Sequence, residues 1–393
     1  MTRFFSYVGI PIKRPARPFA VALALAAPAV PAAAVALMTG PPAQAATSCQ
    51  QATGPFQVSG TQVTGPGGKV FTPYGITVPG LANDPDWADS VTMDEAKIRA
   101  AAQYWCVNTI RLQVSQDNLI GDTGSTPPYQ PYLTAIKTEV SLAESLGLVV
   151  VLNDQTETSS VRNSYQQGPT PGTETFWKDL IPTFGSDPQV IFDLFNEPSY
   201  NQGTTAAQEW SLWHNGGSYQ GATYIGMATL AADLRAADAS TLFWVEGPAY
   251  ASTFAGMEQN NALITTGNVV YAFHHPAGDH DTSAWYDDFG YLINTGVAPV
   301  VDGEWTNYQP FSGTNSECWA DAPSQVPVYL SYLADHGIGM TAYQLAPGLL
   351  IAPNGNYDDP TVIDSQWTCT PASGPTDEGA GTKIMNWYQT QNG

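Results

Sequence analysis

The sequence predicts an α/β fold, a single (β/α)8 TIM barrel, because short apolar runs alternate along it with stretches of helical periodicity. Continuous apolar strands that alternate with helices are typical of a parallel sheet covered by helices. Eight such strands in a segment of about 320 residues favour a closed barrel. The eight runs lie at residues 71–77, 107–114, 148–154, 190–196, 242–247, 269–275, 298–304 and 339–345.

Helical periodicity is clearest in five stretches between and after these runs, at residues 92–105, 132–146, 222–237, 326–336 and 383–390. A doubly wound open sheet is the alternative architecture, but it usually carries a glycine-rich first turn. The sequence contains neither a G-x-G-x-x-G motif nor a P-loop, which disfavours that alternative. It also shows no internal repeat and no linker to a second domain, so we expect one barrel over residues 71–393.

The first 45 residues resemble a secretory signal peptide. A basic segment precedes the apolar stretch at residues 19–38, and an Ala-Gln-Ala exit ends at residue 45. This order is typical of a cleaved signal. A retained membrane anchor is the alternative, but prolines interrupt the alanine-rich stretch. The sequence therefore predicts a secreted protein that has no membrane contact after cleavage and begins with an exposed lead-in over residues 46–70.

The charge balance disfavours one class of partner. The chain has 13 basic and 35 acidic residues, and four of the basic residues lie in the signal segment, which has no acidic residue. The mature chain then carries nine basic and 35 acidic residues, a formal charge of −26. Such a surface repels phosphate backbones, so nucleic acid is not an expected partner, whereas a neutral substrate is compatible with it. A hydrophobic content of 43% indicates a packed core rather than a disordered acidic tail.

The four cysteines, Cys49, Cys106, Cys318 and Cys369, are expected to form two disulfides in an exported protein. Three pairings are possible. Short loop length favours Cys49–Cys106 and Cys318–Cys369. None of the four has the C-x-x-C spacing of a zinc or redox site.

Polar residues gather where the predicted strands end, and in a (β/α)8 barrel the carboxyl ends of the strands carry the active site. Arg111, one of four arginines in the mature chain, lies inside an apolar strand and needs a carboxylate partner there. Glu246 also ends a strand, although a structural role is at least as consistent with its position. The polar and aromatic residues at the other strand ends are Asn153, Asp154, Asn196, Glu197, His274, His275, Glu304 and Trp305.

Glu197 and Glu304 end two different strands, and two facing carboxyl groups are what glycoside hydrolysis requires. One carboxyl group must be protonated to assist the leaving oxygen, while the other must be ionised to attack the anomeric carbon. The alternative is a pair of buried glutamates in salt bridges, which the small number of basic residues disfavours.

Residues 176–199, which end in Asn-Glu-Pro-Ser, resemble the signature region of glycoside hydrolase family 5, the cellulase family of clan A. The resemblance covers most of the mature chain and implies a (β/α)8 barrel with a retaining mechanism. Further segments resemble the first, second, sixth and seventh strands of that family: 72–81 (TPYGITVPGL), 108–112 (NTIRL), 269–275 (VVYAFHH) and 299–305 (PVVDGEW).

The resemblance assigns roles to individual residues. It makes Glu197 the general acid/base and Glu304 the nucleophile of a retaining double displacement, whose two carboxyl groups lie about 5–5.5 Å apart. It implies that Asn196 hydrogen-bonds the 2-hydroxyl of the sugar and that His274 lies beside the reacting sugar or the acid/base. Arg111 would hold Glu304 ionised by lowering its pKa.

Three segments depart from the family pattern. Residues 152–155 read Leu-Asn-Asp-Gln and lack the histidine expected after strand three, while residues 274–276 read His-His-Pro and lack the tyrosine that contacts the nucleophile. Strand eight offers Tyr343 or Gln344 in place of the tryptophan that forms the floor of the catalytic subsite. Trp305, next to the predicted nucleophile, is the tryptophan that we expect to stack on a sugar.

Other chemistries are disfavoured by the motifs. Residues 274–281 gather three histidines and two aspartates, but they lack the regular spacing of a zinc motif, so we expect no metal. A G-x-S-x-G elbow and an H-E-x-x-H motif are absent, which disfavours a serine hydrolase and a zinc protease.

We therefore expect a secreted, monomeric, retaining β-glycosidase that acts on a polysaccharide or oligosaccharide without a cofactor. Endo-β-1,4-glucanase (cellulase-like) activity is the leading prediction, with β-mannanase, β-1,3-glucanase or another β-glycan hydrolase of the family as alternatives. A carbohydrate-binding protein that has lost catalysis on a barrel scaffold is the alternative from another class. The two facing acids disfavour it, because a pure binder does not need them.

Overall fold

The computed structural model describes residues 49–82, 87–121, 128–155, 166–200, 202–237, 239–275, 282–305, 322–346, 349–351 and 380–393. All of these residues belong to one compact unit, Thr47–Gly393. The predicted signal segment and the predicted Cys318–Cys369 pair lie outside the described residues. Within the described ranges, no helix is both long and apolar enough to cross a bilayer.

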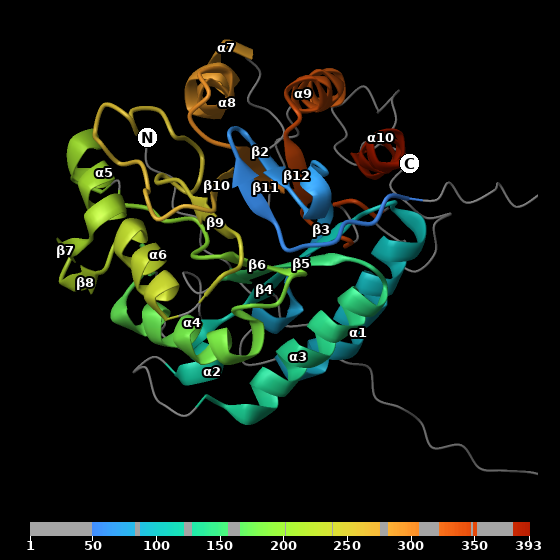
Figure 1. Ribbon diagram of the computed structural model, residues 1–393, viewed down its shortest axis with the longest axis horizontal. Helices are drawn as coiled ribbons and strands as arrows, with labels where there is room; N and C mark the ends of the chain where they lie inside the picture. The colour runs from blue at the N-terminus through green and yellow to red at the C-terminus, as the bar shows by residue number, and fades with distance from the viewer. Residues whose placement is uncertain are drawn as a thin grey trace, which may run out of the picture. The chain divides into compact units, whose positions relative to one another are not determined.

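Eight parallel strands form a closed barrel, and helices surround it (Figure 1). Around the barrel the strands follow one another in chain order, and the last strand pairs with the first. Each strand overlaps one of the eight predicted apolar runs, so the predicted (β/α)8 architecture is confirmed. The strands are β3 (Tyr74–Val78), β4 (Thr109–Val114), β5 (Val149–Asp154), β6 (Val190–Asp193), β9 (Phe243–Glu246), β10 (Val269–Phe273), β11 (Val300–Trp305) and β12 (Gly339–Ala342).

The helices in the described ranges are α1 (Trp87–Tyr104), α2 (Gln116–Ile120), α3 (Gln130–Ser145), α4 (Pro171–Phe184), α5 (Ala206–Asn215), α6 (Met227–Ala236), α7 (Thr282–Trp285), α8 (Tyr291–Asn294), α9 (Ala322–His336) and α10 (Ala380–Asn392). The helix predicted over residues 222–237 is shorter than expected. Its first residues form strand β8 (Ala222–Tyr224) of a hairpin with β7 (Gly217–Tyr219). At Gly226, φ is 71° and a Cβ would lie 2.3 Å from the Gly216 nitrogen, so the chain turns here and α6 begins afterwards.

Alternation along the strands divides the barrel interior into two layers. The apolar lower layer lies toward the amino ends of the strands, and the polar upper layer lies toward their carboxyl ends. On β6, Ile191 faces inward below and Asp193 faces inward above, because side chains two residues apart share a face. Trp244 and Glu246 repeat this order on β9. The inner apolar cluster consists of Phe56, Val63, Phe71, Val149, Val151, Ile191, Leu242, Trp244, Val270, Ala272 and Val301.

The lead-in covers the apolar end of the barrel. Its strands β1 (Gln57–Ser59) and β2 (Gln62–Thr64) form an antiparallel hairpin, drawn in blue in Figure 1. Most of its described residues are exposed, but Phe56 and Val63 are buried in the inner apolar cluster. Phe56 stacks on Phe71 with the ring centroids 4.2 Å apart. The segment predicted as an exposed lead-in therefore also closes the barrel from below.

The two ends of the described chain are fastened beside the start of β4. Cys49 forms a disulfide with Cys106, which is the predicted pairing. The Asn392 Nδ2 of α10 donates to the carbonyl oxygen of Cys106 over 2.8 Å, and the Gln50 N–H donates to the carbonyl oxygen of Asn392 over 2.7 Å. The disulfide and the last helix thus hold the same end of the barrel.

Asp302 is a buried acid on β11 that faces away from the barrel interior. The Tyr329 hydroxyl of α9 donates to its Oδ2 over 2.6 Å, and both side chains are buried. Burial raises the pKa of Asp302 to about 8 from an ordinary value of 3.8, although the hydrogen bond from Tyr329 opposes this shift. Asp302 is therefore largely protonated in the folded protein at neutral pH.

This buried acid should make stability depend on pH. The folded protein holds the Asp302 proton up to about pH 8, whereas the unfolded chain releases it near 3.8, so the unfolding free energy falls as pH rises between these values. The slope from this group is at most about 1.4 kcal/mol per pH unit. Asp302→Asn removes the titration and keeps an acceptor for Tyr329. Denaturant titrations from pH 4.5 to 8.5 should show the variant gaining stability relative to the native protein as pH rises. Parallel curves would contradict the assignment.

Candidate active site

The polar upper layer is organised around Arg111 of β4, whose side chain is fully buried. Its Nε donates to Asp193 Oδ2 over 2.9 Å, and its Nη1 donates to Glu304 Oε2 over 2.7 Å. Its Nη2 donates to Asn196 Oδ1 over 2.7 Å and to Glu246 Oε1 over 2.8 Å. The carboxylate partner that the sequence predicts for Arg111 is confirmed, and three carboxyl groups share that role.

Glu197 follows β6 and has a left-handed backbone, with φ at 47°. This conformation is uncommon for a residue other than glycine and is found at functional sites. The Glu197 N–H donates to Glu246 Oε2 over 2.6 Å. Its side chain is 32% exposed, and its Oε1 lies 2.9 Å from His274 Nδ1. Glu197 is thus held by its backbone on one side and by a histidine ring on the other.

Glu304 approaches from β11, and its side chain is 16% exposed. Its Oε2 accepts a hydrogen bond from Arg111 and a second from Gln113 Nε2 over 3.0 Å. Gln113 also donates to Gln155 Oε1 over 2.7 Å. Gln113 therefore contacts the carboxyl group that a tyrosine contacts in the family pattern, and Gln155 stands where that pattern has a histidine.

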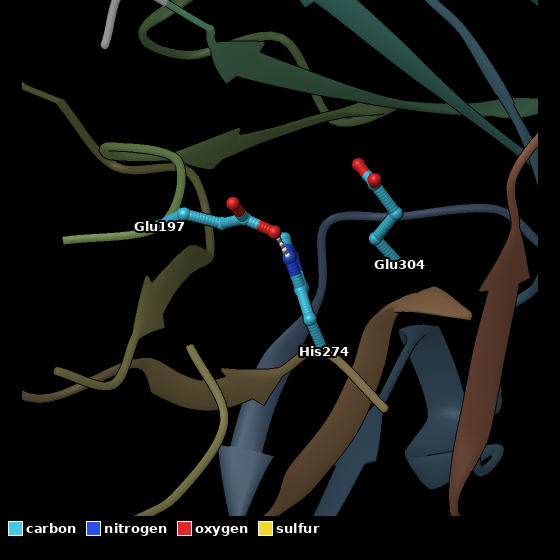
Figure 2. A group of neighbouring side chains, drawn as sticks. All are labelled: Glu197, His274 and Glu304. Atoms are coloured by element: carbon cyan, nitrogen blue, oxygen red, sulfur yellow. Dashed lines mark hydrogen bonds and ion pairs between the residues drawn. The ribbon is translucent and has the colours of Figure 1, made fainter. Parts of the chain in front are cut away.

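The two glutamates meet at the barrel mouth. One oxygen of Glu197, one oxygen of Glu304 and one ring nitrogen of His274 all lie within 4.8 Å of one another. Figure 2 shows the two carboxyl groups reaching into the same space from opposite sides, with the His274 ring against Glu197. An oxygen–oxygen distance of at most 4.8 Å is nearer to the short carboxyl spacing of retaining enzymes than to the wider spacing of inverting ones.

The histidine in this group lies among three carboxyl groups. Burial by itself lowers the pKa of His274, but Glu246, Glu197 and Glu304 together raise this pKa well above its ordinary value. A metal ion needs the neutral ring as a ligand. The three side chains could offer a cation one atom each, but the raised pKa of His274 favours the protonated ring, which cannot bind a metal.

Burial and neighbouring charges act in opposite directions on the pKa values of Glu304 and Glu246. It raises the pKa of Glu304, while His274 and Arg111 act in the opposite direction and Glu197 and Glu246 add to the rise. Arg111 therefore lowers the pKa of Glu304, as the resemblance implies, but burial outweighs it, so the pKa of Glu304 is raised. Burial also favours a raised pKa for Glu246, but His274, Arg111 and the Glu197 N–H lower it below its ordinary value.

Trp305 and Tyr343 are the two aromatic residues that the sequence places at the sugar. Trp305 is fully buried in the apolar layer between the strands and the helices, so the prediction that it stacks on a sugar is wrong. The register of β11 shifts between Asp302 and Trp305, so Glu304 faces inward although Asp302 faces outward, and the side chain of Trp305 faces the helices. Tyr343 follows β12 at the carboxyl end of the barrel and is half-buried, and its N–H donates to the Trp305 carbonyl oxygen over 2.7 Å.

Sequence reasoning missed three side chains that complete the site. Asp193 interrupts an apolar strand, and Gln113 lies two residues after Arg111 on the same inner face, so strand periodicity could have found both. Glu246 was recognised at a strand end but not as the partner of Arg111 and Glu197. The register between strands, which sequence alone does not show, brings these groups together.

Residues 62–348 match the family described as Cellulase (glycosyl hydrolase family 5). The chain belongs to glycosyl hydrolase family 5. It is therefore a glycoside hydrolase of a retaining family, and the predicted resemblance is confirmed. A search of the curated proteins found no significant match to the sequence.

Solved structures of family 5 enzymes are similar to this barrel. A β-glucanase from Saccharophagus degradans, in complex with cellotetraose, is 18% identical and has a TM-score of 0.60, covering 88% of this chain and 95% of its own. An endoglucanase catalytic domain from Thermobifida fusca is 19% identical, with a TM-score of 0.55 and coverage of 86% and 97%. A mannanase catalytic domain from Streptomyces sp. SirexAA-E is 17% identical, with a TM-score of 0.56 and coverage of 84% and 92%. At these identities the similarity shows the fold.

The Arg111 ion pairs give a prediction about stability. Arg111→Met should lower the unfolding free energy by about 3–5 kcal/mol, because it leaves buried carboxylates without a cation. The loss should shrink as pH falls from 7 to 5, since protonated carboxyl groups need no counter-ion. Denaturant titration at both pH values measures this change.

Arg235→Met is the matched control. Arg235 of α6 donates to the carbonyl oxygens of Ala239 and Thr241, so its loss should cost the same free energy at both pH values. An Arg111→Met penalty that is equally independent of pH would contradict the assigned ion pairs.

Proposed function

We propose that this family 5 glycoside hydrolase is secreted and cleaves β-1,4-linked glucan by double displacement, with Glu304 as the nucleophile and Glu197 as the general acid/base. The observation that carries the proposal is the pair of carboxyl groups at the carboxyl ends of β6 and β11, with oxygens within 4.8 Å of each other. The different surroundings of the two groups support the division of roles, because Glu304 contacts Arg111 and Glu197 contacts His274.

The chemistry divides into two steps. In the first, Glu304 attacks the anomeric carbon while Glu197 transfers a proton to the departing glycosidic oxygen. In the second, Glu197 takes a proton from water, and this water breaks the bond between the sugar and Glu304. Because Glu304 Oε2 accepts hydrogen bonds from Arg111 and Gln113, we assign the attack to Oε1.

Two further residues are assigned to the sugar. Asn196 Oδ1 accepts a hydrogen bond from Arg111, which orients the amide and assigns its Nδ2 donor to the 2-hydroxyl of the sugar. A hydrogen bond at this hydroxyl strengthens in the transition state. Tyr343 is assigned as the aromatic floor of the subsite, since it stands at the end of β12 where the family has a tryptophan.

Glucan and mannan are the two leading substrates. The acidic composition suits a neutral polysaccharide. A similar barrel was solved with cellotetraose, which supports glucan, while the similar mannanase structure keeps mannan as the second candidate. The disulfide between Cys49 and Cys106 supports secretion, because such bonds persist in oxidising compartments.

The test is the release of reducing sugar from β-glucans, mannans, xylans and galactans by the protein without its first 45 residues. We expect activity on a β-1,4-glucan, and Glu304→Gln should lower it by more than about 10³-fold because the nucleophile is lost. Glu258→Gln, which changes an exposed glutamate, is the matched control and should retain activity.

Several outcomes would change the proposal. Activity on mannan alone would replace the substrate, and activity undiminished in Glu304→Gln would contradict the assigned nucleophile. A folded protein that binds a glycan but hydrolyses no polymer would support the non-catalytic alternative.

A further inference from the structure

A third carboxyl group lies directly behind the proposed acid/base. Glu246, at the end of β9, is fully buried and therefore acts through its neighbours rather than on substrate. Its Oε2 accepts the N–H of Glu197 over 2.6 Å. Its Oε1 lies 2.8 Å from Arg111 Nη2 and 3.2 Å from His274 Nε2, the latter an ion-pair contact that is not aligned as a hydrogen bond. Glu246 thus contacts both the backbone of Glu197 and the ring that binds its side chain.

Both ring nitrogens of His274 face carboxyl oxygens. Nδ1 lies 2.9 Å from Glu197 Oε1, and Nε2 lies 3.2 Å from Glu246 Oε1. An ionised carboxylate can only accept hydrogen bonds, so the ring satisfies both neighbours when each nitrogen carries a hydrogen. The other titratable groups that act on the ring are Glu304 and Asp302 of β11 and Asp193 of β6.

The contact at Nδ1 distinguishes the two oxygens of Glu197. When Nδ1–H donates to Oε1, a proton carried by the same carboxyl group belongs on Oε2. The backbone contact fixes where that oxygen lies, because the Glu197 N–H is held by Glu246 in a left-handed conformation that costs of order 1–3 kcal/mol. A single carboxylate therefore controls both the location of the acid/base and the site of its proton.

We propose that Glu246 is a positioning residue for the acid/base: it holds the backbone of Glu197 and favours the doubly protonated ring of His274, whose Nδ1–H donates to Oε1 of Glu197, so that Oε2 of Glu197 carries the catalytic proton. In the first step this proton moves from Oε2 to the glycosidic oxygen as the carbon–oxygen bond breaks. In the second step Oε2 takes a proton from water. The inference rests on the proposed roles of Glu197 and Glu304.

Glutamine cannot replace Glu246 in this arrangement. Oε2 faces one donor, the Glu197 N–H, and Oε1 faces two, Arg111 Nη2 and His274 Nε2. The amide group of glutamine would oppose a donor in either orientation. In both orientations the negative charge beside His274 is also lost. Among the carboxyl groups that raise the pKa of His274, Glu246 has the largest effect, so the loss of its charge should lower that pKa.

The first test follows the ring nitrogens of His274 by ¹⁵N NMR, with His274→Asn used to assign its signals among the five histidines. In the native protein we expect both nitrogens to be protonated at pH 7. In Glu246→Gln the proton affinity of the ring should fall at least tenfold. Asp193→Asn is the matched control, because it removes another carboxyl group that binds Arg111 and should leave the ring protonated at pH 7.

The second test compares two substrates, cellotetraose and 2,4-dinitrophenyl β-cellobioside. The dinitrophenolate leaves without protonation, so its release does not need the acid. Glu246→Gln should lower kcat/KM for cellotetraose by about 10²-fold and for the activated substrate by less than about tenfold. Asp193→Asn should change both values in the same proportion. If Glu246→Gln does not fold, Glu246→Asp keeps the charge and should keep the ring protonated.

The outcomes separate this inference from the proposed function. A neutral His274 at pH 7 in the native protein, or an unchanged titration in Glu246→Gln, would overturn the inference. An equal loss on both substrates in that variant would also overturn it. A native protein that hydrolyses neither substrate, with a His274 ring that still depends on Glu246, would reject the proposed function while supporting the contact.

Discussion

The arrangement of the barrel mouth depends on one constraint, the burial of the Arg111 guanidinium. A buried cation must be offset by carboxylates, and the planar guanidinium requires them in fixed directions. Acids from β6, β9 and β11 meet that requirement, and each is placed by the register of its strand. The inner apolar cluster below, closed by Phe56, keeps water away from the lower side of this network. Ion pairs are stronger in such surroundings than at a surface. The ion pairs of Arg111 therefore hold the polar layer in one arrangement.

The same network gives two glutamates different surroundings. Glu304 is the less exposed of the two and is held by a permanent cation and a neutral amide. Glu197 is more open to the barrel mouth and is held by a histidine that itself depends on Glu246. An acid beside a permanent cation is suited to act as an anion, whereas an acid beside a titratable ring is suited to exchange a proton. The difference between the two roles therefore arises from neighbours on β4, on β9 and directly after β10.

Sequence reasoning found what depends on local pattern. The eight strands were predicted because each is a continuous apolar run, and Glu197 and Glu304 because they stand where such runs end. Trp305 faces the helices because the register of β11 shifts between Asp302 and Trp305, which a single strand does not reveal. The roles of Glu246 and Gln113 depend on which strand lies opposite, and the pKa of Glu304 depends on how deeply the carboxyl group is buried. These properties belong to the assembled barrel and have no signature in a single segment.

As the proposed nucleophile, Glu304 forms a covalent bond with the sugar in the first step. The most direct measurement is mass spectrometry of the protein after incubation with 2,4-dinitrophenyl 2-deoxy-2-fluoro-β-cellobioside, whose fluorine slows both steps while the dinitrophenolate still leaves. We expect a mass increase of one fluorinated cellobiosyl group, located in the peptide that contains Glu304 and absent from Glu304→Gln. A label on Glu197, or hydrolysis of cellotetraose with inversion at the anomeric carbon, would contradict it.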